Sequence, residues 1–263
     1  NAAITATSGS MNLTNVDTGS ALSPTSNNGA LTVATGKSGT TSELKTVAAG
    51  GTDVSVTTSL TSGQGTTITS RGNARLASVT ATTDDVTIKA VNGEVTGIGA
   101  DGANLSATVG KVIVEAGSLA RLKTVTSGNE TSVKADNITV TSGGQIKAVG
   151  QTITLTAKDA SIGGVVEGTT INIVNPSAST APLVLGGTGS VAGAFTLEQS
   201  ELDQLRATNL NFDATSATAA TNAKNIEIRS ASFGTQSGSS AINFLTRGRI
   251  DVTGTVKADN SSA

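Results

Sequence analysis

The sequence predicts an all-β fold, an elongated parallel β-helix (β-solenoid) with irregular loops at the corners of its coils. Aliphatic residues alternate with polar ones in short bursts, which is the periodicity of strands rather than of helices. Aromatic residues make up only 2% of the 263 residues, whereas 31 are glycine, so the core must be thin and built from small aliphatic side chains. A solenoid coil encloses such a core and buries it against neighbouring coils.

Short strands are expected where aliphatic residues stand two positions apart. Turn-forming Gly, Asn, Asp, Ser or Thr residues flank nearly every one. Inward Val, Ile and Leu would stack between coils, and outward Thr and Ser would face the solvent. In chain order, the expected strands are Leu31–Val33, Val54–Val56, Val86–Ile88, Val112–Val114, Ile138–Val140, Ile153–Leu155, Ile171–Ile173, Ile226–Ile228 and Ile250–Val252.

A second element, Leu-x-x-Val or a close variant, precedes several of these strands and indicates degenerate copies of one unit. The steps between strands interpreted as matching are 23 residues from Leu31 to Val54, 32 from there to Val86, and 26 both to Val112 and onward to Ile138. Steps of this size fit one coil of three short strands. The copies of the element are Leu44–Val47, Leu76–Val79, Leu122–Val125, Ile146–Val149 and Leu202–Leu205.

The least regular segments lie after residue 174. Ser177–Ala181 stands between two prolines, in a possible loop or seam at 175–183, and Ala214–Ala223 is interpreted as another loop. The one helical candidate, Thr196–Arg206, repeats the Leu-x-x-Leu pattern and is interpreted as a bent strand. We therefore expect residues 1–263 to form a single solenoid segment, and the absence of an initiator Met indicates a piece of a longer protein.

A β-sandwich is the competing fold, because it also combines many short strands with frequent turns. Sandwiches rely on tight hairpins and a bulky core. The sequence has few Asn-Gly hairpin signals and almost no aromatic residues, so the solenoid is favoured.

The composition excludes most familiar catalytic and metal sites. The chain has no Cys and no His, which removes disulfides, thiol nucleophiles, Ser-His-Asp triads and HExxH zinc sites. Its 17 basic and 19 acidic residues are dispersed and give a net charge of −2, unlike the basic surface that binds nucleic acids. No apolar run approaches the about 20 residues of a membrane helix. We expect neither nucleic-acid binding nor membrane insertion of this segment.

Asp84 and Asp85 form the one adjacent aspartate pair. Some parallel β-helices cleave polysaccharides with paired carboxylates, so catalysis is one interpretation. No His accompanies the pair, Lys89 is the only basic residue nearby, and a related turn contains Asp53 alone. The simpler interpretation is that these aspartates cap backbone amides before a strand.

Three further motifs have ordinary structural explanations. Gly50–Val54 and Gly99–Gly102 faintly resemble calcium-binding β-roll repeats, but the nonapeptide is never complete. Gly97–Gly102 lacks the strand–helix context and the Lys-Ser/Thr of a phosphate-binding loop. Thr-x-Thr pairs such as Thr67–Thr69 and Thr139–Thr141 enclose aliphatic residues that must point inward, which argues against an ice-binding array. No catalytic, cofactor-binding or metal-ligating residue is expected.

Residues 195–252 resemble the repeats of filamentous-haemagglutinin-like exoproteins, especially the long surface adhesins of Gram-negative bacteria. The resemblance lies in a Glu-Leu-x-x-Leu-x-Ala-x-x-Leu string from Glu201 to Leu210, followed by the Asn-Ile-x-Ile strand at Asn225–Ile228. It implies a right-handed parallel β-helix, export by a two-partner or autotransporter route, and an extracellular or cell-surface location. No secretion domain is recognisable in the chain.

These observations favour a non-catalytic, structural and adhesive segment that acts as a stalk or fibre in adhesion or biofilm formation. The expected partners are a host, surface or glycan receptor and neighbouring repeats of the same chain. A carbohydrate-binding or carbohydrate-cleaving β-helix is one alternative. A filament subunit that associates end to end is another, because open strand edges can pair.

Overall fold

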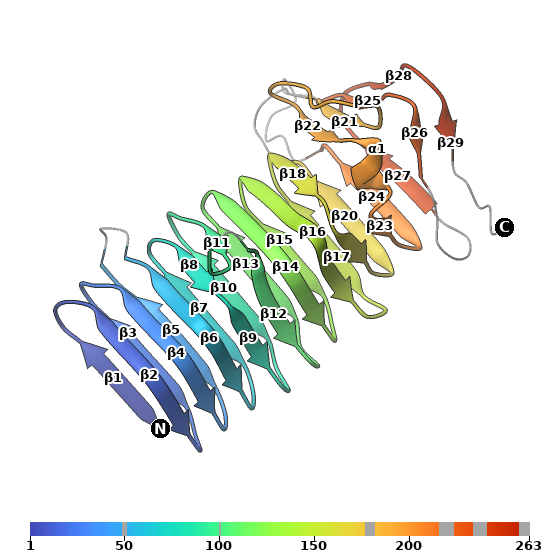
Figure 1. Ribbon diagram of the computed structural model, residues 1–263. Coiled ribbons are helices and arrows are strands. Elements are labelled where there is room, and N and C mark those ends of the chain that lie inside the picture. Colours follow the sequence, from blue (N-terminus) through green and yellow to red (C-terminus); the bar gives the residue numbers. More distant parts are fainter. Residues whose placement is uncertain (49–51, 100, 177–181, 216–223, 234–240, 258–263) are drawn as a thin grey trace.

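The computed structural model describes residues 1–48, 52–99, 101–176, 182–215, 224–233 and 241–257. Within them the chain forms a parallel β-solenoid, which confirms the predicted fold class. Figure 1 shows the coils stacked in sequence order from the N-terminus, in blue, to the C-terminal strands, in red. The expected loop at Ser177–Ala181 and most of the one at Ala214–Ala223 lie outside the described residues.

Sheet A runs along one side of the whole stack and contains eleven strands, one from each successive coil. Its residues alternate between the core and the solvent, and each strand between the two end strands β1 and β27 buries two or three side chains. The strands are β1 (Ala2–Ala6), β3 (Leu22–Ser26), β5 (Ser42–Thr46), β7 (Thr66–Ser70), β10 (Val86–Ala90), β13 (Val112–Ala116), β15 (Thr131–Lys134), β17 (Thr152–Thr156), β20 (Thr170–Val174), β24 (Asn209–Asp213) and β27 (Ala241–Leu245).

Sheet B contains twelve strands and bends around the other two sides of the coils. The bend is visible where β6 pairs with β8 through its first three residues and with β9 through its last three. The strands are β2 (Met11–Thr18), β4 (Leu31–Ser38), β6 (Val54–Ser62), β8 (Ala74–Leu76), β9 (Ser78–Ala81), β11 (Val95–Thr96), β12 (Ala103–Ala107), β14 (Leu119–Ser127), β16 (Asn137–Ala148), β18 (Asp159–Ile162), β19 (Val165–Glu167) and β23 (Leu205–Arg206).

Two small sheets complete the C-terminal coils. Sheet C contains β21 (Leu183–Leu185), β22 (Phe195–Leu197), β25 (Ile226–Ile228) and β28 (Ile250–Val252), and sheet D contains β26 (Ala231–Ser232) and β29 (Val256–Lys257). The helix α1 (Gln199–Leu202) is a single turn with a capping box between Glu198 and Glu201. The interpretation of Thr196–Arg206 as a bent strand is therefore wrong, because this capping box starts a helical turn between β22 and β23. No helix in the described part of the chain could span a membrane.

The nine expected strands all form, but some of the predicted matches between them are wrong. Val86 is the register partner of Val112, as expected, whereas Val54 pairs with Ala74 and Val112 pairs with Thr131. These two predicted matches join strands of sheet A to strands of sheet B, because inward aliphatic residues look alike on every side of the coil. The true coil step varies from 18 residues, between Thr154 and Asn172, to 39 residues for the coil that adds β21, β22 and α1.

The Leu-x-x-Val element is not a repeating unit of one kind. Leu76 and Val79 are both fully buried and lie on either side of the bend in sheet B, and Leu122 and Val125 occupy the same place two coils later. Leu76 and Val79 are three positions apart, and in a straight strand such residues would point to opposite faces. The corner between them lets both side chains face inward. Leu44, by contrast, lies in sheet A, so the likeness between these segments has no single structural cause.

The core is a continuous column of aliphatic side chains, as the composition predicts. One such column runs inside sheet A, and each of its members is at most 1% exposed: Leu44, Ile68, Ile88, Val114, Val133, Leu155, Ile173 and Phe212. Aromatic packing is confined to the C-terminal coils, where the rings of Phe212, Phe233 and Phe244 lie 5.6 to 5.8 Å apart.

Candidate functional site

The aspartates singled out in the sequence lie at coil corners and bind backbone amides. Asp85 Oδ1 accepts a hydrogen bond from the backbone N–H of Lys111 in the next coil at 2.7 Å, and Asp84 Oδ1 accepts one from Asp85 N–H at 2.9 Å. Asp53 Oδ1 accepts one from Asn73 N–H at 2.8 Å. The predicted capping role is confirmed, and this geometry gives the catalytic interpretation of the pair no support.

The corner at Asp53 continues into a short ladder between coils. Asn73 repeats the role of Asp53, since its Oδ1 accepts the backbone N–H of Glu94 at 3.0 Å. A strand of sheet B begins directly after each of Asp53, Asn73 and Glu94. The side chains therefore supply acceptors for amides that the turn leaves without a backbone partner.

The described residues of the glycine-rich turns form no cluster of metal ligands. Asp101 forms an ion pair with Lys123 at 3.4 Å, and Gly99 adopts a positive φ that suits a tight turn. Gly50 and Gly51 lie outside the described residues. Among the residues that the structure describes, no group of three or more Asp, Glu, His or Cys residues could hold a metal ion.

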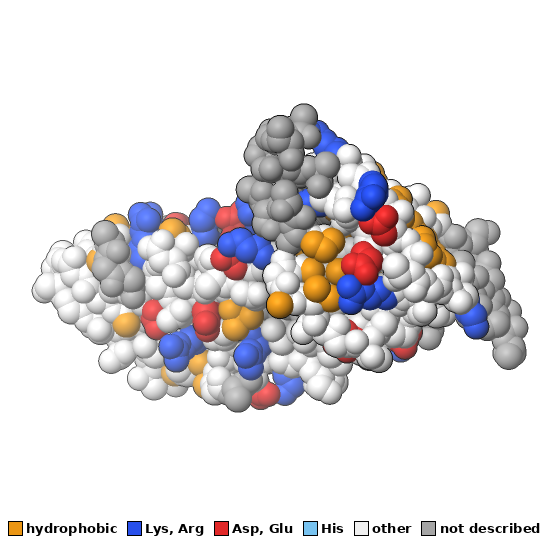
Figure 2. All heavy atoms as spheres, turned by 90° about the horizontal axis from the view of Figure 1, so that it is seen from above, with side chains coloured by type: hydrophobic (Ala, Val, Ile, Leu, Met, Phe, Trp, Pro, Cys, Tyr) orange, Lys and Arg blue, Asp and Glu red, His pale blue; other side chains and the backbone are white. Residues whose placement is uncertain are grey.

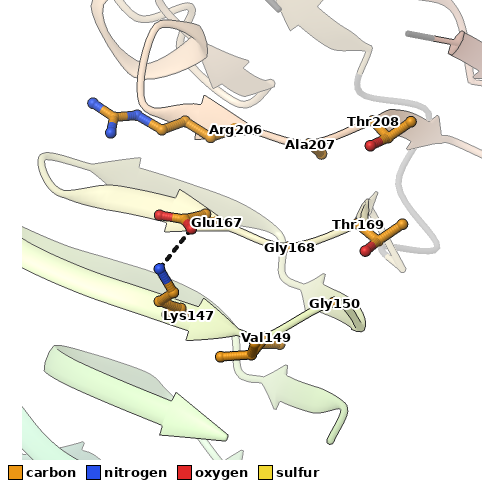
Figure 3. Close-up of a pocket in the computed structure, with 10 residues that line it drawn as sticks. Lys147, Val149, Gly150, Glu167, Gly168, Thr169, Arg206, Ala207 and Thr208 are labelled. Atoms are coloured by element: carbon orange, nitrogen blue, oxygen red, sulfur yellow. Dashed lines mark hydrogen bonds and ion pairs between the residues drawn. The ribbon is translucent and has the colours of Figure 1, made fainter. Parts of the chain in front are cut away.

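One surface depression is a groove of about 400 Å³ at the corner where sheet B turns into sheet A. Three successive coils contribute Lys147, Glu167 and Arg206, which are register neighbours on β16, β19 and β23. Lys147 Nζ contacts Glu167 Oε1 at 2.7 Å, as the dashed line in Figure 3 marks. The rest of the groove is lined by Ala148, Val149, Gly150, Gly168, Thr169, Ala207 and Thr208.

Charged and hydroxyl side chains make up much of the lining of this groove. Arg206 Nε is buried without a hydrogen-bond partner, so the guanidinium retains donor capacity. Thr169 and Thr208 add hydroxyl groups on one side, while Val149 is 58% exposed. Glu167 is the single carboxylate of the lining, whereas glycoside hydrolysis ordinarily needs two.

Sequence reasoning missed a buried lysine. Lys224 is 0% exposed, and its Nζ donates to the backbone oxygen of Asn175 at 2.7 Å. Burial lowers the pKa of Lys224, although the negative charge of Asp213 opposes this effect. No motif marks Lys224 in the sequence, because the contact depends on two segments 49 residues apart.

Charged side chains are spread along the outside of the stack. Figure 2 shows acidic and basic groups lying next to one another on the face in view, with uncharged surface between them. Many are pairs between adjacent coils, such as Lys89 with Glu115 at 2.8 Å and Lys158 with Asp136 at 2.9 Å. Exposed pairs of this kind contribute little stability, about 0 to 1 kcal/mol each.

In comparisons with protein-family models, curated proteins and solved structures, nothing matches this chain.

Proposed function

We propose that the chain is a rod-like structural and adhesive segment of a large secreted bacterial surface protein, and that it is not catalytic. The observation that carries the proposal is the unbroken stack of parallel coils. Eleven strands of sheet A at about 4.8 Å per step give the stack a length of about 50 Å. Each coil adds length without adding a closed core, which suits a stalk that holds a binding region away from a cell.

The outer surface also supports this proposal. Outward positions of sheet A are mostly Thr, Ser, Asn and paired charges, so the face is well solvated. The resemblance of residues 195–252 to filamentous-haemagglutinin-like repeats adds the expectation of an extracellular, adhesive role.

A second candidate function is carbohydrate binding at the corner groove. Its support is the set of polar side chains in the lining, in which the Thr169 and Thr208 hydroxyls and Arg206 accompany the Lys147–Glu167 pair, since glycans are recognised by such polar groups. The groove lining has no aromatic side chain on which a sugar could stack, which favours weak binding rather than cleavage.

A bead assay with the purified chain tests both candidates. Beads coated with the folded chain are expected to be retained on a glycan array or an epithelial cell layer more than beads coated with albumin. The array is also assayed for newly released sugar ends. Retention without release supports the adhesive proposal, whereas release of sugar ends contradicts the non-catalytic part, and no retention on either surface contradicts the adhesive part.

Variants locate the binding surface. Arg206→Ala is expected to reduce retention if the groove binds the glycan. Lys37→Ala is the matched control, because Lys37 is an exposed basic residue that pairs with Asp17 far from the groove. Equal retention of both variants would exclude the groove.

A further inference from the structure

The contact between Lys224 and Asn175 brings an amine against a carboxamide inside the protein. Lys224 Nζ lies 2.7 Å from the backbone oxygen of Asn175 and 3.2 Å from its Oδ1. Lysine is rarely buried completely, and a buried lysine is usually paired with an acid. Here both described hydrogen bonds of Nζ go to one asparagine.

Both residues are held in place by their own backbones. Asn175, which follows β20, is 1% exposed, and its N–H donates to the backbone oxygen of Asp213 at 3.0 Å. The carbonyl of Lys224, which precedes β25, accepts a hydrogen bond from the hydroxyl of Thr246. Groups fixed in this way react as parts of one molecule, which greatly lowers the entropic barrier to bond formation.

The environment also favours the reactive form of the lysine. Desolvation disfavours the ammonium ion, so burial lowers the pKa of Lys224 and increases the fraction of neutral amine. A neutral, desolvated lysine amine is a nucleophile towards carbonyl carbon.

We propose that Lys224 and Asn175 join in an intramolecular amide bond. Nζ attacks Cγ of Asn175, the Nζ–Cγ bond forms, and the Cγ–Nδ2 bond breaks. The proton lost by Nζ is transferred to Nδ2, which leaves as ammonia, so no oxidant or outside reactant is needed.

The residue after Asn175 prevents the usual competing reaction, which is cyclic imide formation. Asparagine commonly loses ammonia when the backbone N–H of the next residue attacks its side chain and forms a cyclic imide. Pro176 has no backbone N–H, so this route is closed at Asn175. Loss of ammonia from Asn175 would therefore indicate attack by a nucleophile other than the backbone N–H of the next residue.

The bond would close a long loop of the chain. The cross-link spans 49 residues, and the segment between its ends contains β21, β22, α1, β23 and β24. A cross-link that closes a loop of this size restricts the unfolded chain and so stabilises the fold. Tension applied along the chain would also pass through the bond instead of extending the loop.

Mass spectrometry of the wild-type chain decides the proposal. After denaturation and proteolysis, we expect a branched peptide that contains both Asn175 and Lys224, and an intact mass about 17 Da below that of the sequence. Imides at Asn28 or Asn92, each followed by glycine, would lower the mass equally, so the branched peptide is the deciding result. Linear peptides with unmodified Asn175 and Lys224 would overturn the proposal, whether or not any variant folds.

Variants assign the roles within the site. Lys224→Met and Asn175→Ala are expected to abolish the branched peptide, whereas Lys158→Met, at an exposed lysine paired with Asp136, should retain it. A branched peptide that persists in Lys224→Met or in Asn175→Ala would show that other residues form the cross-link, which would overturn the proposal.

Discussion

At the scale of single residues, polar side chains before the strands replace hydrogen bonds that the turns leave unmade. Asp53 uses both carboxylate oxygens. Its Oδ1 accepts a hydrogen bond from the backbone N–H of Asn73 at 2.8 Å. Its Oδ2 accepts one from Asn73 Nδ2 at 3.3 Å and lies 3.7 Å from Arg75 Nε. The bond at Oδ1 satisfies a backbone amide, whereas the contact with Arg75 is an ion pair in which the Arg75 side chain is 54% exposed. The hydrogen bond should therefore dominate.

Substitutions at this corner separate the two contributions. Asp53→Ala is expected to lower the free energy of unfolding by about 1 to 3 kcal/mol, because the amide of Asn73 loses its acceptor. Asp53→Asn keeps an oxygen at that position and should lose less. Arg75→Ala should change stability by less than about 1 kcal/mol. Urea unfolding of the three variants measures this order, and a larger loss in Arg75→Ala than in Asp53→Ala would show that the ion pair dominates.

Glu201 gives the stability a pH dependence that can be isolated. Desolvation raises the pKa of Glu201 above its ordinary value of 4.5, although the backbone N–H groups of Glu198 and Ile162 oppose the shift. The folded state then holds the proton more tightly than the unfolded state. The contribution of Glu201 to stability must therefore fall as the pH rises from 4.5 through the raised pKa.

Matched variants check this sign. The stability difference between Glu201→Gln and the wild type should move in favour of the variant as the pH rises above 4.5. Glu115 provides the opposite case, because the hydrogen bond from Lys89 lowers the pKa of its carboxyl. The free energy of unfolding of Glu115→Gln should fall relative to that of the wild type as the pH rises towards 4.5. Parallel pH profiles for the two variants would contradict the assigned environments.

At the scale of the elements, the corner between sheet B and sheet A alternates between two ways of filling the core. Ser62 and Thr66 form a buried hydroxyl pair at 2.7 Å. One coil later their register partners are Ala81 and Val86, which are also fully buried. Polar partners thus occur together, and apolar partners occur together, because a lone buried hydroxyl would lose its hydrogen bond.

A double-mutant cycle tests this pairing. Ser62→Ala should destabilise the chain by about 1 to 3 kcal/mol, because the Thr66 hydroxyl loses its described partner. Thr66→Val should cost less, because the Ser62 hydroxyl still lies 3.2 Å from the backbone oxygen of Gln64. The double variant should cost less than the sum, since it recreates the apolar pair of the next coil. The coupling energy from urea unfolding is expected to be about 1 to 2 kcal/mol. Additive losses would mean that the two hydroxyls do not depend on each other.

The sequence predicts the elements of this fold better than their pairing. Strands such as Val86–Ile88 could be located because alternating β-branched residues between turn residues have few other structures available. The strands that pair with them could not be predicted, because buried valines occur on every side of the coil. The capping role of Asp85 follows from local chemistry, whereas the burial of Lys224 depends on a contact 49 residues away.

At the scale of the whole molecule, each coil contacts mainly the coils directly before and after it. The strands of sheet A follow one another in chain order through all eleven coils, whereas the strands of sheet B do not pair in simple chain order. Stability in such an array is the sum of local terms and nearest-neighbour interfaces, so one end can open while the other stays folded. The aromatic cluster of Phe212, Phe233 and Phe244 makes the C-terminal end chemically distinct from the aliphatic coils that precede it.

Phe212→Ala tests whether the molecule behaves as such an array. Phe212 is 0% exposed, and its ring lies 5.6 Å from that of Phe233 and 5.7 Å from that of Phe244, so its removal should cost about 3 to 5 kcal/mol. The loss should be local, because the N-terminal coils do not contact this cluster. Amide hydrogen exchange is therefore expected to accelerate in β24 to β29, while β1 to β15 keep their wild-type protection. Ile88→Ala, in the column of sheet A, should instead expose the coils around β10. Equal acceleration throughout the chain in either variant would mean that the solenoid unfolds as one cooperative unit, and that the end coils do not fold and open independently of the rest.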